Sequence, residues 1–69
     1  MRAAEYIKIL LIKENMTITK LAQKFSEHSG KKLSRSNLSN KLKRETIKFS
    51  EVLTICEILG YDLNFVKKQ

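Results

Sequence analysis

Apolar side chains recur every three or four residues in four segments of the chain, which is the spacing of one face of an α-helix. The pattern predicts helices over residues 3–14 and about 35–43, a second that follows Thr17 through Phe25 with no breaker before Gly30, and a fourth between Ser50 and Gly60. We therefore expect an all-α fold with one core. The inward-facing residues expected from these stripes are Ala3, Ile7, Leu10, Leu11, Ile18, Leu21, Ala22, Phe25, Leu38, Leu42, Val52, Leu53, Ile55, Cys56, Ile58 and Leu59.

Residues that cap or end helices stand between the stripes. Thr17, Ser34 and Ser50 each precede a stripe, and a side-chain oxygen there can accept from the free amides of the first turn. Gly30 and Gly60 each follow a stripe, where glycine readily takes the left-handed conformation that closes a helix. The chain has no proline and only two glycines, so few breakers interrupt the helices.

The C-terminal segment, YDLNFVKKQ, has a different pattern. Tyr61, Leu63 and Phe65 alternate with polar residues, which indicates a short strand. A short fifth helix capped by Asp62 is the competing interpretation, and the strand is favoured. The predicted organisation is a single domain over residues 1–69 that ends in a C-terminal strand or tail.

The charge balance is strongly positive. Fourteen Lys and Arg against seven Asp and Glu give a net charge of +7 in 69 residues, which favours an anionic partner. Nucleic acid is the first candidate and a membrane surface the second. The apolar run Ile9–Ile12 is far too short to cross a bilayer, and the N-terminus lacks the features of a signal peptide. A single Cys56 agrees with a reducing compartment, so we expect a cytoplasmic protein.

The third predicted helix, SRSNLSNKLKR, carries the most informative surface. Leu38 and Leu42 share one face, and the rest of the helix has no acidic and no further apolar residue. Hydrogen-bonding side chains lie near its start and positive charges near its end. Such a face suits a groove lined with base edges and phosphates, although a solvated surface helix has a similar appearance. The polar residues of this surface are Ser36, Asn37, Ser39, Asn40, Lys43 and Arg44.

The sequence offers little for catalysis or metal binding. His28 lies at a polar helix end, where exposure is expected, and Cys56 lies on an apolar face, where a small buried hydrophobe is expected. There is no set of zinc ligands at suitable spacing and no Gly-rich phosphate loop. We therefore expect no enzyme activity, no cofactor, no metal and no small-molecule substrate.

The segments TITKLAQKF, SRSNLSNKL and FSEVLTICEILGY together resemble the phage repressor and Cro-type (lambda-repressor-like) helix-turn-helix family. The resemblance covers about residues 5 to 61. It implies a compact four-helix domain that binds double-stranded DNA sequence-specifically and regulates transcription, often as a dimer. One departure is the segment SEHSGKK, which makes the turn between the two motif helices about six residues longer than usual. The matching positions are Thr17, Leu21, Ala22, Ser34, Leu38, Ile55, Leu59 and Gly60.

Within this interpretation, the helix 35–43 enters the major groove and its early residues read base edges. Arg35 suits a guanine and Asn40 an adenine, because each can form two hydrogen bonds there. The expected base contacts are made by Arg35, Ser36, Ser39 and Asn40. The expected phosphate contacts are made by Thr17, Thr19, Lys31, Lys32, Asn37, Lys41, Lys43, Arg44 and Lys48.

Two further interpretations concern protein partners. Ile9 and Ile12 lie outside the core stripe of the first helix, so they offer apolar surface to another chain. In the alternative to DNA binding, the chain is a small protein-interaction module that holds its partner with this surface. The surface serves a homodimer if the strand over residues 61–69 pairs with its copy about a two-fold axis. A monomer whose tail folds back on the first helix is the other outcome. RNA and anionic lipid are disfavoured, because no aromatic residue stands apart from an apolar pattern and no segment joins a basic to a broad apolar face.

Overall fold

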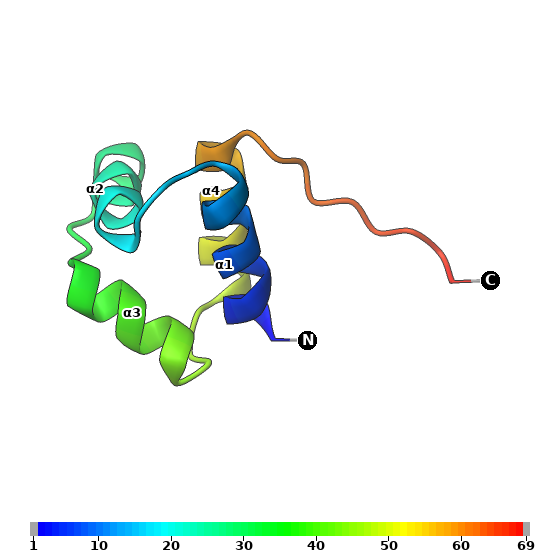
Figure 1. Cartoon of the computed structure of the whole chain (residues 1–69), viewed down its shortest axis with the longest axis horizontal. Helices are drawn as coiled ribbons and strands as arrows, with labels where there is room; N and C mark the ends of the chain where they lie inside the picture. The colour runs from blue at the N-terminus through cyan, green and yellow to red at the C-terminus, as the bar shows by residue number, and fades with distance from the viewer. Residues whose placement is uncertain (1, 69) are drawn as a thin grey trace.

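The computed structural model describes residues 2–68 and contains four α-helices joined by short loops (Figure 1). They are α1 (Ala3–Lys13), α2 (Ile18–Ser29), α3 (Arg35–Lys43) and α4 (Phe49–Leu59). Helix α2 packs against both α3 and α4, and α1 packs against α3. The all-α prediction is confirmed. Met1 and Gln69, the ends of the predicted domain and tail, lie outside the described residues.

Each helix contributes one fully buried large side chain to a common core. Ile7, Leu21, Leu38 and Ile55 are these four residues, and they come from α1, α2, α3 and α4 in turn. Since all four helices bury their apolar stripes in the same cluster, the orientation of α3 is set by its fit against the other three.

The expected helix caps of α2 and α3 are present. The Thr17 hydroxyl accepts from the Lys20 amide at 3.1 Å, and the Ser34 hydroxyl accepts from the Asn37 amide at 3.1 Å. Gly30 ends α2 with a φ of 74°, and Gly60 ends α4 with a φ of 82°. Local sequence therefore fixes both ends of α2 and the start of α3.

The start of α4 differs from the prediction. The helix begins at Phe49 with Lys48 as its N-cap, and Ser50 lies inside the first turn. The Glu51 carboxylate reaches back and accepts from the Lys48 amide at 2.8 Å. This bond caps the helix from its third residue, so no hydroxyl at position 50 is needed.

Two residues expected in the core lie outside it. Leu53 is 42% exposed, and Ala3 is exposed whereas Ala4 is half-buried. At about 100° per residue, Leu53 stands about 160° around the helix from Ile55, which is fully buried. Its outward position follows from this rotation, and it belongs with Phe49 to an exposed apolar edge of α4.

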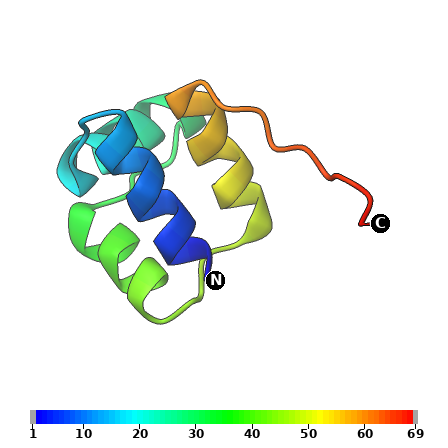
Figure 2. The ribbon, with the colours of Figure 1, turned by 45° about the vertical axis from the view of Figure 1, so that its right-hand side comes forward.

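Residues 61–68 form neither the predicted strand nor a fifth helix. A strand needs a neighbour for its backbone hydrogen bonds, and the described part of this single chain has no other strand. The segment runs away from the helices as an extended tail (Figures 1 and 2). The Tyr61 hydroxyl donates to Glu14 at 2.9 Å, and the Phe65 ring stacks on Phe49 with centroids 6.4 Å apart. The tail therefore contacts α1 through Tyr61 and the first residue of α4 through Phe65.

Candidate nucleic-acid interface

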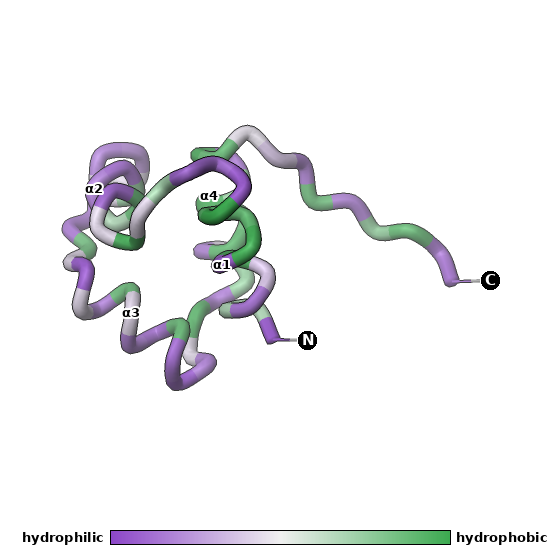
Figure 3. The backbone as a smooth tube through the Cα atoms, in the orientation of Figure 1, coloured by the Kyte–Doolittle hydropathy of each residue, from purple (hydrophilic) through white to green (hydrophobic). Residues whose placement is uncertain are grey.

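Helix α3 is held by two leucines and exposes the rest of its surface. Leu38 and Leu42 are buried, and most other residues of the helix are hydrophilic (Figure 3). Among the residues expected to read bases, Ser39 alone is half-buried. The exposed polar residues of the helix and its C-cap are Arg35, Ser36, Asn37, Asn40, Lys43 and Arg44.

Ser36, Asn40 and Lys43 follow one another at three- and four-residue spacing, so they line one ridge. That ridge lies opposite the two buried leucines. It presents a hydroxyl, an amide and an ammonium group in order along the helix, and no acid interrupts it. A surface of donors and acceptors followed by a positive charge is suited to base edges beside a phosphate.

The long turn between α2 and α3 is accommodated without separating the two helices. Helix α2 continues to Ser29, and Gly30 then reverses the chain. The Ser26 hydroxyl accepts from the Leu33 amide at 2.8 Å and lies 3.0 Å from the Ala22 carbonyl, to which it can donate. Leu33 packs against the core just before the Ser34 cap. Residues 26–29 of the extra segment thus lengthen α2, the residues from Gly30 onward form a short braced loop, and α2 still packs against α3.

Sequence reasoning missed two basic residues beside α3. Arg2 and Lys8, at the start of α1 and within it, line an open depression of about 440 Å³ together with Ser39 and Lys43. Lys8 directly follows the buried Ile7, and its place next to the core stripe could have indicated that it lies near α3. The half-buried Ser39 therefore faces the α1 side of the helix, where Arg2, Lys8 and Lys43 place positive charges beside one acid, Glu5.

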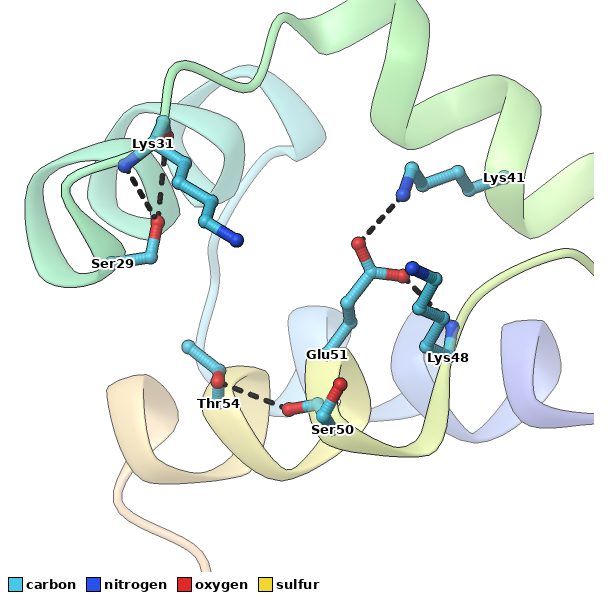
Figure 4. Close-up of polar contacts among 7 residues, drawn as sticks. All are labelled: Ser29, Lys31, Lys41, Lys48, Ser50, Glu51 and Thr54. Carbon is cyan, nitrogen blue, oxygen red and sulfur yellow. Dashed lines mark hydrogen bonds and ion pairs between the residues drawn. The ribbon is translucent and has the colours of Figure 1, made fainter.

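Lys41 differs from the other basic residues of α3. Its Nζ lies 2.6 Å from Glu51 Oε2, and the other carboxylate oxygen of Glu51 accepts from the Lys48 amide (Figure 4). Burial acts to raise the pKa of Glu51, but the hydrogen bonds from Lys41 and Lys48 and the charges of both lysines outweigh it and hold the pKa below its usual value. Lys41 is therefore directed toward α4 as part of an ion pair.

The basic residues of the loops fall into different surroundings. The Lys31 side chain points toward the space between α2 and α4, where it lines a depression of about 330 Å³ with Lys48 and Glu51 (Figure 4). Lys32 is exposed, as are Thr17 and Thr19 at the start of α2. The structure thus brings Lys41 and Lys48 into contact with Glu51, and Lys31 lines the same depression as this acid.

The residues considered for other chemistry have ordinary structural positions. Cys56 is buried, and burial raises the pKa of its thiol, so the thiolate is disfavoured. His28 is exposed and lies 3.5 Å from Glu57. Within residues 2–68 there is no group of three side chains that could hold a metal ion, and no helix long and apolar enough to cross a membrane.

A model of the Cro/C1-type HTH DNA-binding domain matches residues 6–64, which is most of the chain. The chain belongs to this family. It is a DNA-binding regulatory fold and not an enzyme family. No curated protein and no solved structure matches the chain.

Proposed function

We propose that this Cro/C1-type domain is a sequence-specific regulator of transcription, a repressor of phage or mobile-element type, that inserts α3 into the major groove of double-stranded DNA. The observation that carries the proposal is the acid-free ridge of Ser36, Asn40 and Lys43, which faces away from Leu38 and Leu42. Residues 1–69 act as one DNA-binding domain, since all four helices share one core. Double-stranded DNA as the ligand suits a cytoplasmic site of action, and so does the single buried Cys56, since a lone thiol agrees with a reducing compartment.

The base-reading residues are Arg35, Ser36, Ser39 and Asn40. Arg35 and Asn40 have the side chains that bond two groups of one base, guanine and adenine respectively. Ser36 is exposed on the ridge, and Ser39 serves the edge of the groove nearest α1. Early residues of a recognition helix reach deepest into the groove, which supports this grouping.

Phosphate contacts come from the surroundings of the ridge. Exposed hydroxyls at the start of α2 lie beside free backbone amides, which favour an anion. Lys8 is included among the phosphate-binding residues because it lines the same depression as Ser39. The proposed phosphate-binding residues are Thr17, Thr19, Lys31, Lys32, Asn37, Lys41, Lys43, Arg44, Lys48 and Lys8.

Selection from random duplex DNA at moderate salt tests the proposal. We expect enrichment of one pseudo-palindrome with half-sites about one helical turn apart, since two copies related by a two-fold axis read such a site. Binding of all duplexes with equal affinity would remove sequence specificity from the proposal. No binding even at low salt would remove DNA as the ligand.

A homodimer is part of the proposal because the apolar and basic surfaces are segregated. Among residues 2–68, eight large apolar side chains are exposed, and all of them lie on α1, on α4 or in the tail. None of these eight lies on α2 or α3, which carry most of the proposed DNA surface. They are Tyr6, Ile9, Ile12, Phe49, Leu53, Leu63, Phe65 and Val66. A second copy that pairs with the extended tail would cover this surface and leave both α3 helices free.

The same apolar surface supports the second candidate function, a protein-interaction module that uses α1. Ile12 is 79% exposed although it belongs to a helix whose other face is buried in the core. Ile12→Ser separates the two functions, because it should weaken capture of a protein partner and leave binding of one DNA half-site unchanged.

A further inference from the structure

Helices α3 and α4 are joined by a polar contact where they have little direct packing. Each packs mainly on α2, and α3 packs also on α1. The Lys41–Glu51 pair spans the two helices at 2.6 Å, and the loop between them is closed by the bond from the Lys48 amide to the same carboxylate. One acid therefore engages the last turn of α3, the loop and the first turn of α4 (Figure 4).

The burial of this pair distinguishes it from the other ion pairs of the described residues. The side chains of Lys41 and Glu51 are 31% and 18% exposed, and both oxygens of the carboxylate are occupied. Arg2–Glu45 and His28–Glu57 are longer and more exposed. A short, half-buried pair with a second hydrogen bond is held more firmly than exposed pairs, which contribute little.

Lys41 also closes the end of α3 through its backbone. Its carbonyl accepts from the Thr46 amide at 2.9 Å, in the turn where Glu45 has a φ of 57°. The ion pair and this turn thus act on the same residue. Loss of the pair would release the Lys41 ammonium group. It would also leave the orientation of the last turn of α3 less firmly fixed.

We propose that Glu51 is a positioning residue for DNA recognition, which orients the C-terminal turn of α3 and withholds Lys41 from the phosphate backbone. The inference rests on the proposed function and refines it, because Lys41 leaves the set of phosphate contacts. An ammonium group already neutralised by a carboxylate releases few counterions from DNA, and the adjacent acid repels a phosphate.

The test measures binding to the selected duplex and to a scrambled duplex at several salt concentrations. Lys41→Met should leave the slope of log K against log salt nearly unchanged, whereas Lys43→Met should lower it by about one unit. Glu51→Gln retains an acceptor for the Lys48 amide and frees Lys41. It should raise the slope by about one unit and reduce the preference for the selected duplex several-fold.

Glu57→Gln is the matched control, because it removes one exposed acid from α4 at a place away from α3. The double variant Lys41→Met with Glu51→Gln should return the slope to the wild-type value. An equal fall in slope for Lys41→Met and Lys43→Met would overturn the inference, as would equal effects of Glu51→Gln and Glu57→Gln.

A measurement without DNA separates this inference from the proposed function. In urea unfolding, a double-mutant cycle over Lys41→Met and Glu51→Gln should show coupling between the two residues, and the same cycle over Lys41→Met and Glu57→Gln should show none. Coupling with no DNA binding by the wild type would contradict the proposed function alone. Absence of coupling would contradict the positioning role, whatever the chain binds. If Glu51→Gln fails to fold, the slope of Lys41→Met decides the matter.

Discussion

Asn40 and Lys43 occupy the same exposed ridge of α3, yet their chemistry predicts different losses. An amide pairs with one base edge, so Asn40→Ala should cost about 1–3 kcal/mol on the preferred duplex and relax the choice at one base pair. Competition binding with single-base variants of the site measures both effects. Asn37→Ala, which removes the same amide from a proposed phosphate contact, should weaken all duplexes alike. An equal loss on random DNA for Asn40→Ala would show that the ridge meets the groove in another way.

Lys43→Ala tests the electrostatic part of the interface. Loss of one phosphate contact should weaken all sequences about equally and lower the salt slope by about one unit. Anisotropy titrations over a salt series give the slope directly. Lys13→Ala removes the same charge from the last turn of α1 and should change the slope much less. A loss confined to the preferred site, with the slope unchanged, would argue against a phosphate contact.

Sequence predicted the residues whose partners are local and missed those whose partners are distant. The caps at Thr17 and Ser34 each need only an amide three residues away. The ion pair of Lys41 was missed because Glu51 lies ten residues further along the chain. Ser26 gave no signal at all, since its bond to Leu33 depends on the path of the turn. The Ser50 cap was wrong because Glu51 reaches back to cap α4 instead.

At the scale of elements, the turn between α2 and α3 depends on one hydroxyl. Ser26→Ala removes the acceptor of the half-buried Leu33 amide, which should destabilise the fold by about 1–2 kcal/mol. Urea unfolding measures this loss. Ser29→Ala is the control, because its bonds to Lys31 are exposed and 3.2–3.4 Å long, and it should change stability much less. Equal effects would show that the turn is held by the packing of Leu33 alone.

The end of α3 is strained at a residue with a side chain. Glu45 has a φ of 57°, in the left-handed region that glycine takes more readily than other residues. Glu45→Gly should therefore stabilise the fold by about 0.5–1 kcal/mol, since relief of strain exceeds the entropic penalty of glycine. Glu45→Ala loses the same charge and the same exposed pair with Arg2, but should bring no such gain. Thermal unfolding of the two variants gives the comparison.

For the whole molecule, Glu51 should also govern part of the response to acid. Its pKa in the folded state lies below the ordinary value of 4.5, so its contribution is present above that pH and is lost as pH falls through the lowered pKa. Stability measured by urea unfolding should fall in this range for the wild type. Glu51→Gln should be less stable at neutral pH and show a shallower acid slope, whereas Glu57→Gln should retain the wild-type slope.

The helical core was predictable because each stripe is defined by its own segment, but the state of the tail was not. Alternation of Tyr61, Leu63 and Phe65 indicates which residues share a face, and a strand forms only when a neighbour accepts its backbone hydrogen bonds. The tail of one chain has no such neighbour within residues 2–68. The conformation of the tail in an oligomer therefore cannot be predicted from the sequence of one chain.

Deletion of residues 62–69 tests that assembly. The truncation keeps Tyr61, whose amide bonds the Cys56 carbonyl and whose hydroxyl bonds Glu14, so the four helices should still fold. We expect the full chain to sediment as a dimer and the truncated chain as a monomer that binds DNA weakly and without regard to half-site spacing. The Phe65 side chain is 86% exposed in the single chain, so Phe65→Ser should weaken the dimer while the chain keeps its full length. Asn64→Ser should leave the dimer unchanged. A full chain that sediments as a monomer at high micromolar concentration would contradict the dimer, because the tails of two copies would then not associate even when the chain is abundant.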